Sequence, residues 1–196
     1  MSENKNIRSF LAIDPPGGVL ENIQAMQNRL KRNIQGVIRW VRPEGIHLTL
    51  KFFGDISEQD VADISEVIAR RTNAIPPFAL EVGGLGAFPD AIRPRIIWLG
   101  ITGHLEQLLS LQKDLEEGFF SLGFPKDDRT FRAHLTMGRV KVPKGIIGLD
   151  TAVDAGGKLT AGTFTVGEVA LFQSSLSPQG ATYTRLAVFP LRGDKL

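Results

Sequence analysis

The sequence predicts an α+β fold in which helices and strands form two related lobes that face each other across a cleft. A four-residue motif occurs twice, as His-Leu-Thr-Leu at 47–50 and as His-Leu-Thr-Met at 134–137, although the chain has only three histidines in 196 residues. Each motif lies near the end of a segment with the order strand, helix, histidine strand. These segments are 8–53 and 94–140.

The two segments also match in length. The separation between Phe10 and His47 differs by only one position from that between Trp98 and His134. Two copies are too few for a solenoid, which stacks at least three units. We therefore expect a duplicated unit, with two lobes related by a pseudo-twofold axis inside one domain that spans 1–196.

Local patterns predict the elements of the first half. Residues 8–14 have the apolar pattern of a strand. Asp14 and Pro15 suit the N-cap and first residue of a helix, whose apolar face repeats at Val19, Ile23, Met26 and Leu30. The next strand is expected at 45–54, around the first motif. Ser-Glu-Gln-Asp at 57–60 is a capping box that opens a second helix, with an apolar face at Val61, Ile64 and Ile68.

The second half continues in the same way. A strand at 77–89 is expected to run into a glycine-rich turn, and a buried strand is expected at 94–101. A third helix has an apolar face at Leu105, Leu108, Leu115 and Phe119. The second motif lies in a strand at 131–140. Near the C-terminus, the turn residues Leu-Ser-Pro-Gln-Gly separate 163–175 from 181–191, which predicts a hairpin.

Composition limits the classes of function. The chain has no cysteine, which excludes disulfides and thiolate zinc sites and agrees with the cytoplasmic location that we expect. No run of about 18 apolar residues is present, and the first ten residues lack the apolar core of a signal peptide, so no membrane association is expected. A net charge of +2 and a pI ≈ 9.0 permit an anionic partner without by themselves indicating nucleic acid.

Side chains of a strand alternate between its two faces. Each motif strand should therefore carry an imidazole, a hydroxyl and a cation on one face, namely His47, Thr49 and Lys51 in the first strand and His134, Thr136 and Arg132 in the second. The opposite faces are apolar and should pack on the helices of the same lobe. These apolar residues are Ile46, Leu48, Leu50 and Phe52, and Phe131, Ala133, Leu135 and Met137.

Two imidazoles and two hydroxyls suit phosphoryl chemistry. Splitting a phosphodiester needs a base that activates the nucleophile and an acid that protonates the leaving oxygen. Histidine can do either near neutral pH because its unperturbed pKa is ~6.5. A threonine hydroxyl can donate a hydrogen bond to a nonbridging phosphate oxygen. Lys51 and Arg132 could offset phosphate charge or could be solvated charges on the cleft rim, and the sequence favours neither interpretation.

Other interpretations of these residues are weaker. A catalytic zinc needs at least three protein ligands, and neither H-x-x-x-H nor H-x-H occurs near the motifs, so we expect no metal. Gly83, Gly84 and Gly86 form neither a P-loop nor a dinucleotide-binding motif. His104 has no threonine two positions later and lies near a predicted helix start, so we expect it to be structural.

Around both motifs the chain resembles the two-histidine phosphoesterase superfamily, which is defined by a duplicated H-x-T-x motif. More narrowly, it is similar to the RNA 2',3'-cyclic phosphodiesterases, also called 2'-5' RNA ligases. The similarity covers nearly the full chain and runs through FLAID, WVRPEGIHLTLKFFGDI, RPRIIWLGI, FRAHLTMGRV and LSPQGATYTRLAVFPL. One departure is Ala133, where the family usually has proline. It affects local rigidity and leaves the histidine and threonine in place.

The resemblance implies a bilobal α+β fold with an antiparallel sheet in each lobe, helices outside and both sheets lining the cleft. It implies hydrolysis of a terminal 2',3'-cyclic phosphate to a 2'-phosphate without metal, ATP or any other cofactor. His47 would protonate the departing 3'-oxygen, His134 would activate water, and Thr49 and Thr136 would hold the phosphate. Arg139 matches a family position, although alternation from His134 places it on the opposite face unless the strand bulges or ends.

The implied partner is an RNA or oligonucleotide end that carries a 2',3'-cyclic phosphate, and no obligatory protein partner is evident. Members of the family also join certain RNA ends by a 2'-5' bond. Two alternatives remain open: a phosphodiesterase for a small cyclic phosphate, such as an ADP-ribose derivative, and a noncatalytic module that binds RNA ends. The second alternative is disfavoured, because binding needs hydroxyls and cations more than proton-transfer groups.

Overall fold

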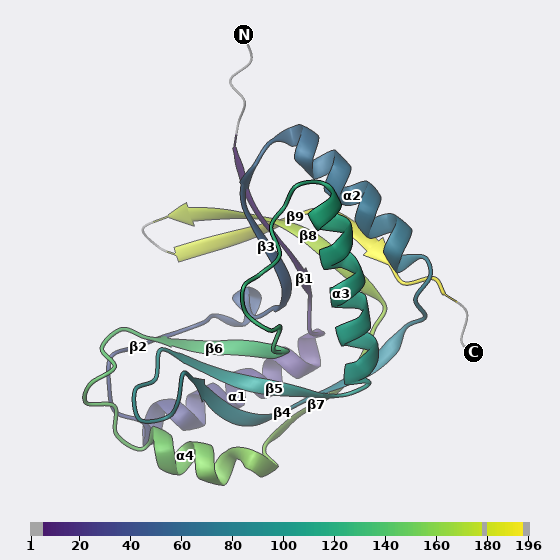
Figure 1. Cartoon of the computed structure of the whole chain (residues 1–196). Coiled ribbons are helices and arrows are strands. Elements are labelled where there is room, and N and C mark those ends of the chain that lie inside the picture. Colours follow the sequence, from purple (N-terminus) through teal and green to yellow (C-terminus); the bar gives the residue numbers. More distant parts are fainter. Residues whose placement is uncertain (1–5, 178–179, 194–196) are drawn as a thin grey trace.

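A computed structural model describes residues 6–177 and 180–193 of the chain, which form two antiparallel sheets with helices packed against them (Figure 1). Sheet I, in the upper part of the figure, has the strand order β3-β1-β8-β9. Sheet II, in the lower part, has the order β2-β6-β5-β4-β7. Every strand pair in both sheets is antiparallel. The expected α+β fold, with an antiparallel sheet in each lobe, is confirmed.

The strands of sheet I are β1 (Ile7–Ile13), β3 (Leu48–Ile56), β8 (Glu168–Ser177) and β9 (Gly180–Pro190). The strands of sheet II are β2 (Ile38–Trp40), β4 (Phe78–Phe88), β5 (Ile96–Gly103), β6 (His134–Val140) and β7 (Thr160–Val166). The α-helices are α1 (Gly17–Asn33), α2 (Glu58–Thr72), α3 (Leu105–Ser121) and α4 (Leu149–Ala155), and the short 3-10 helices are η1 (Pro43–Gly45) and η2 (Gly156–Lys158).

Helices α1 and α3 are exchanged between the two sheets. Helix α1 follows β1 of sheet I but packs on sheet II, where the buried Gln27 amide donates to the carbonyls of Val41 and Met137 at 2.8 and 2.9 Å. Helix α3 follows β5 of sheet II but packs on sheet I, where the ring of Phe119 lies edge-on to that of Phe53. The prediction that each lobe packs on its own helices is therefore wrong for α1 and α3, whereas α2 follows β3 and contacts β8 and β9 of the same sheet. After α1 the chain adds β2 to the edge of sheet II, and this pairing carries the helix to that sheet.

A β-bulge follows the threonine of the first motif. Thr49 pairs with Ala12 and Lys51 pairs with Leu11, so Leu50 has no partner on β1. A bulge adds one residue to one strand and disturbs the alternation of side chains beyond it. The period of two that assigns faces to 46–52 therefore holds only as far as Leu50.

The second motif has a bulge at the equivalent place. Thr136 pairs with Trp98 and Gly138 pairs with Ile97, so Met137 has no partner on β5. The bulge returns the side chain of the second residue beyond it to the face that carries the histidine. The two motif strands thus share the same irregularity as well as the H-x-T-x motif.

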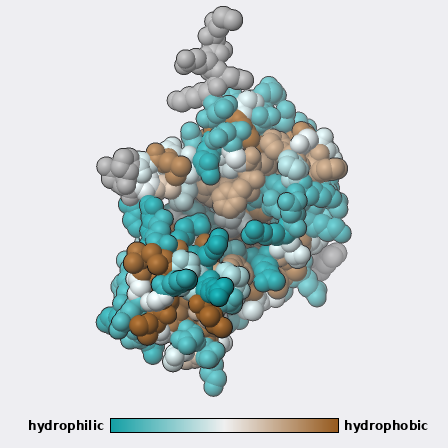
Figure 2. Space-filling model, turned by 60° about the vertical axis from the view of Figure 1, so that its left-hand side comes forward, coloured by the Kyte–Doolittle hydropathy of each residue, from teal (hydrophilic) through white to brown (hydrophobic). Residues whose placement is uncertain are grey.

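Burial of the apolar motif residues agrees with the prediction from alternation. Leu48, Leu50, Leu135 and Met137 are at most 3 % exposed and belong to one continuous core that both sheets share. A separate small cluster lies on the other face of sheet I and consists of Phe10, Ala12, Ala170 and Phe172. In Figure 2, light brown side chains gather in the upper centre of the visible face, hydrophilic ones lie below them, and separate dark brown side chains lie in the lower part of the face.

One of the two predicted helix N-caps is present in the structure. The hydroxyl of Ser57 accepts from the Asp60 amide, and the Asp60 carboxylate accepts from the Ser57 amide, so the predicted capping box is present. The predicted cap at Asp14 is wrong. Helix α1 begins at Gly17 with Pro16 as its N-cap, which leaves the Asp14 carboxylate free for another role.

Several strand limits also differ from the prediction. The segment 163–175 divides at Gly167 into β7 of sheet II and β8 of sheet I. Strand β4 continues through the glycines expected to form a turn. At one of them, Gly86, the ring of Trp98 fills the place that a Cβ would take. Pattern reading missed β2 and α4. The hairpin of β8 and β9 is present, and residues 178–179 of its predicted turn lie outside the described residues.

Candidate active site

The two motif strands approach each other from different sheets. Strand β3 is an edge of sheet I, and Cα atoms of β3 and β6 come within 8 Å of each other. Figure 1 shows β6 passing beneath the lower part of β3. His47 immediately precedes β3 and His134 is the first residue of β6, so both imidazoles are at the start of their strands.

Charged groups hold the His47 ring on one side. Its Nδ1 lies 2.7 Å from Oδ1 of Asp14. The other carboxylate oxygen of Asp14 accepts from the Arg185 guanidinium, whose Nε is 3.0 Å away. Arg185 also donates to Glu168 at 3.2 Å. A chain of hydrogen bonds and ion pairs therefore runs from the imidazole through Asp14 and Arg185 to Glu168 at the surface.

The Asp14 carboxylate is an anion at neutral pH. Burial raises its pKa, but hydrogen bonds from His47 and Arg185 outweigh this and hold the pKa below its ordinary value. The carboxylate can only accept, so Nδ1 of His47 donates to Asp14 and Nε2 is left for a ligand. A negative charge at Nδ1 is the support that suits an imidazole to act as a proton donor.

Three aromatic rings surround the rest of His47. The ring centroids of Phe10, Phe172 and Tyr183 lie 5.6, 4.9 and 5.0 Å from the imidazole centroid. Nε2 is buried and has no hydrogen-bond partner among the described residues. Tyr183 is 36 % exposed and each phenylalanine only 3 %, so Tyr183 is the ring with most freedom to admit a ligand. A buried nitrogen without a partner costs roughly 1–3 kcal/mol, which a ligand oxygen can recover.

The backbone fixes the tautomer of neutral His134. Its Nδ1 lies 2.6 Å from the carbonyl oxygen of Arg132. A carbonyl oxygen only accepts, so Nδ1 carries the proton and Nε2 presents a lone pair. The ring lies edge-on to Phe88 at 5.1 Å and near Trp98 at 6.5 Å, while the Arg132 guanidinium lies over Phe88 at 5.8 Å. This arrangement suits His134 to accept a proton.

The motif threonines have free hydroxyls. Thr49 and Thr136 are both partly exposed, and neither side chain forms a hydrogen bond with a described residue. Thr49 lies opposite the small Ala12, and Thr136 lies opposite Trp98. Each hydroxyl is therefore two residues from a motif imidazole and available to a ligand.

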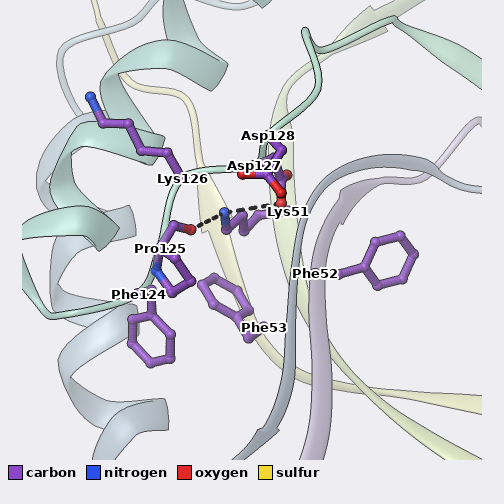
Figure 3. Close-up of a pocket in the computed structure, with 8 residues that line it drawn as sticks. All are labelled: Lys51, Phe52, Phe53, Phe124, Pro125, Lys126, Asp127 and Asp128. Atoms are coloured by element: carbon purple, nitrogen blue, oxygen red, sulfur yellow. Dashed lines mark hydrogen bonds and ion pairs between the residues drawn. The ribbon is translucent and has the colours of Figure 1, made fainter.

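The structure places Lys51 away from the motif face, contrary to the prediction (Figure 3). Its side chain is 4 % exposed, and its ammonium nitrogen lies 2.6 Å from Glu116, 3.4 Å from Asp127 and 2.8 Å from the carbonyl of Pro125. Burial raises the pKa of Glu116, but the hydrogen bond from Lys51 contributes to a net lowering. These contacts fasten the 124–128 segment to β3, and we leave Lys51 out of the proposed phosphate site.

Phe52 occupies the face from which Lys51 is missing. The two side chains point to opposite sides of β3 in Figure 3, and Phe52 is 64 % exposed rather than buried as predicted. Its ring lies 5.7 Å from that of Phe10, in the small cluster beside His47. The bulge at Leu50 accounts for both errors, because it exchanges the faces of the residues that follow.

The bulge at Met137 brings Arg139 to the face of the motif histidine, whereas the bulge at Leu50 takes Lys51 away from it. This side chain is exposed, whereas Met137 and Val140 on either side of it are in the core. It therefore lies on the face of His134. From the sequence, this was expected only if the strand contained a bulge or ended there. Arg132, just before β6, is also exposed and lies beside the same histidine.

The third histidine has a structural role, as predicted. His104 occupies the N-cap position of α3, and its Nδ1 accepts a hydrogen bond from the Ala79 amide at 3.1 Å. Across residues 6–177 and 180–193, no group of three or more metal-ligating side chains comes together. Within those ranges, none of the helices is both long enough and apolar enough to span a bilayer.

Comparison with known families gives this geometry a context. A model of the LigT-like phosphoesterase family matches the chain twice, over residues 13–98 and 99–183, and each match contains one motif. The chain belongs to the LigT-like phosphoesterase family. The two-histidine assignment made from the motifs is thereby confirmed at the level of the family.

Relatives match this phosphoesterase over nearly its whole length. It is 35 % identical over 185 residues to the RNA 2',3'-cyclic phosphodiesterase of Methanothermobacter thermautotrophicus, covering 94 % of this chain and 99 % of the relative. It is 34 % identical over 183 residues to that of Archaeoglobus fulgidus, covering 93 % and 99 %. The crystal structure of TT0787 from Thermus thermophilus matches with a TM-score of 0.79 and 28 % identity, covering 96 % and 100 %.

Sequence reasoning missed the residues that support His47 in this LigT-like phosphoesterase. Asp14 was assigned to a helix cap, and Arg185 and Tyr183 to an ordinary hairpin strand. The pairing of Ile13 with Leu48 puts Asp14 directly opposite His47, so knowledge of the β1–β3 register would have found it. Arg185 and Tyr183 carry no local signal, because β9 reaches the site only through its pairing with β8.

Proposed function

We propose that this LigT-like phosphoesterase hydrolyses the terminal 2',3'-cyclic phosphate of RNA to a 2'-phosphate by general acid–base catalysis. The observation that carries the proposal is the unequal support of the two motif imidazoles. His47 has a carboxylate at Nδ1, whereas His134 has a carbonyl. In both rings Nδ1 is occupied, which leaves Nε2 for the substrate. The names of the relatives supply the substrate class.

In the proposed reaction His134 acts as the base. Its unprotonated Nε2 takes a proton from water as the water oxygen bonds to phosphorus. The bond between phosphorus and the 3'-oxygen breaks, and His47 as imidazolium gives its Nε2 proton to that oxygen. The product carries a 2'-phosphate and a free 3'-hydroxyl, and one further proton exchange with solvent resets the pair of imidazoles.

The remaining residues of the proposed site bind and orient the phosphate. The hydroxyls of Thr49 and Thr136 donate to its nonbridging oxygens, and Arg139 and Arg132 offset its charge. The exposed ring of Phe52 offers an apolar surface to the terminal nucleoside. Approach to Nε2 of His47 requires Tyr183 to move aside. If the 5'-hydroxyl of a second RNA replaces water, the same displacement of the 3'-oxygen forms a bond from phosphorus to the 5'-oxygen and joins the two ends by a 2'-5' bond. We propose this ligation as a secondary activity.

We also propose that the chain is one bilobal domain with a duplicated strand–helix–histidine-strand unit. Two consecutive matches of one family model, each with one motif, support this. The bulge that follows the threonine in both β3 and β6 is a second point of correspondence. The exchanged packing of α1 and α3 is a third, because each helix leaves one sheet and covers the other.

Product analysis tests the proposed function directly. Purified protein is incubated with an oligoribonucleotide ending in a 2',3'-cyclic phosphate, in excess EDTA and without ATP. We expect a 2'-phosphate end and undiminished turnover, because two imidazoles and two neutral hydroxyls are too few strong ligands for a catalytic zinc. A 3'-phosphate product would contradict the proposed leaving group. Loss of activity that one divalent ion restores would contradict acid–base catalysis by histidine alone. Binding without turnover would favour the noncatalytic module.

The pH dependence gives a second test. One imidazole must be neutral and the other charged, so we expect a bell-shaped profile of kcat/KM with its maximum between about pH 5.5 and 8. Initial rates are measured from pH 4.5 to 10 at constant ionic strength. A rate that rises steadily to pH 10 would indicate a metal hydroxide or another nucleophile in place of the histidine pair.

A further inference from the structure

Two arginines face each other across the edge of sheet II. Arg39 on β2 pairs directly with Arg139 on β6, and both side chains are exposed. Like charges directly opposite in an antiparallel pair are destabilising. In the ranges 6–177 and 180–193, no carboxylate lies within 4 Å of either guanidinium. The chain thus holds two positive charges together without compensation.

A third arginine joins them from the segment after β2. A Cβ placed on Gly180 would lie 2.8 Å from Nη2 of Arg39 and 3.9 Å from Nη2 of Arg42. The two guanidinium groups therefore converge on one point at the start of β9. Gly180 has a φ of +131°, which disfavours other residues, and its missing side chain gives Arg39 the space. Arg42 is likewise exposed and has no ion pair with a described carboxylate.

This cluster is connected to the proposed active site on both sides. Strand β6 carries His134 and Thr136 and then Arg139, and β9 carries Gly180 and then Tyr183, which contacts the His47 ring. A strand rises about 3.3–3.4 Å per residue, so the three-residue step from Tyr183 to Gly180 spans on the order of 10 Å. That distance is too long for the terminal phosphate itself but suits phosphates further along the same nucleic acid strand.

We propose that Arg39 and Arg42 form a subsite for the internal phosphodiesters that precede the terminal cyclic phosphate of an RNA strand. The inference rests on the proposed function and deepens it, because it makes an oligonucleotide the preferred substrate. A cyclic mononucleotide such as adenosine 2',3'-cyclic phosphate has no second phosphate and gains nothing from the subsite. An RNA phosphate between the guanidinium groups also relieves their mutual repulsion, and each planar fork can donate two hydrogen bonds to it.

The test compares two substrates with the same reacting end. Adenosine 2',3'-cyclic phosphate is assayed beside a hexaribonucleotide that ends in adenosine 2',3'-cyclic phosphate, with wild-type protein and with the double variant Arg39→Gln/Arg42→Gln. We expect the double variant to lose about tenfold or more in kcat/KM on the hexanucleotide, mainly through KM. Turnover of the mononucleotide should stay close to wild type, which also verifies the fold. The salt dependence on the hexanucleotide should weaken, with a log–log slope smaller by about 0.7 for each phosphate that the variant no longer neutralises.

A matched control separates a local subsite from net charge. Arg29→Gln/Arg32→Gln removes the same two charges from exposed positions of α1 and should leave both substrates unaffected. The subsite is refuted by an unchanged hexanucleotide rate in the Arg39/Arg42 variant, by equal losses on both substrates, or by equal losses in the control. If the wild-type protein turns over neither substrate, the proposed function itself fails. Turnover of both substrates with any of the three refuting results overturns only the subsite.

Discussion

Replacing either motif histidine with alanine is expected to reduce kcat by at least about 10²-fold, because general acid or base catalysis contributes about 10²–10⁴. His47→Ala removes the proton donor held by Asp14. His134→Ala removes the imidazole whose tautomer is fixed by the Arg132 carbonyl, and with it the Nε2 lone pair that would accept the proton. Both rings lie at the start of a strand, and neither belongs to the hydrophobic core beneath the motifs, so the fold should persist. Steady-state rates on a cyclic-phosphate oligonucleotide measure the effect.

The double variant distinguishes a cooperating pair from two separate contributions. Residues that act as one catalytic unit are strongly non-additive, so His47→Ala/His134→Ala should be little slower than either single variant. His104→Ala is the matched control, since that imidazole lies at the start of α3, accepts from the Ala79 amide and is outside the proposed site. Its kcat should be unchanged. Near-normal turnover by a folded His47 or His134 variant would refute the two-histidine mechanism.

Asp14→Asn should have the next largest effect, a loss on the order of 10–10²-fold in kcat. The amide keeps the shape of the side chain but not its charge, so the imidazolium of His47 loses the anion that stabilises it. The ring remains present, which is why the expected loss is smaller than that of His47→Ala. Since kcat reports the complex with substrate, it should fall more than KM rises.

The pH profile separates positioning by Asp14 from a purely structural role. Asp14→Asn removes a negative charge that lies 2.7 Å from Nδ1 of His47, so we expect the alkaline limb of the kcat profile to move to lower pH. The pKa of Asp14 is held below its ordinary value. Its pairing therefore stabilises the fold above the unfolded pKa of about 3.9 and is lost only as pH falls through the folded value. The titration of Asp14 cannot produce a limb near neutrality.

Glu168→Gln is the control for Asp14, because Glu168 contacts Arg185 at 3.2 Å and not the imidazole. It should leave both kcat and the position of the alkaline limb unchanged. A variant Asp14→Asn with wild-type kcat, or one whose limb does not move while its melting temperature falls, would assign Asp14 to stability alone.

Sequence patterns were reliable wherever a regular period governed the side chains. The H-x-T words located both imidazoles and both hydroxyls, and the same period buried Leu48 and Leu135 beneath them. The capping box at Ser57 could be predicted because its donors and acceptors lie within four residues. Strict alternation failed two to three residues beyond each threonine, at Lys51 and Phe52 in β3 and at Arg139 in β6. A bulge depends on how the neighbouring strand pairs, so it cannot be predicted from the sequence of the motif strand alone.

The sequence by itself determined the α+β class, the two H-x-T-x motifs and the apolar residues beneath them, because these follow from residue type and from periods within one strand or helix. Only the tertiary structure decided what surrounds the motifs. The β1–β3 register brought Asp14 to His47, and the bulges exchanged Lys51 for Phe52 and recovered Arg139. The pairing of β2 with β6 gathered the arginines. These contacts join segments far apart in the chain, and the free energy of packing and strand pairing, not local propensity, selects them.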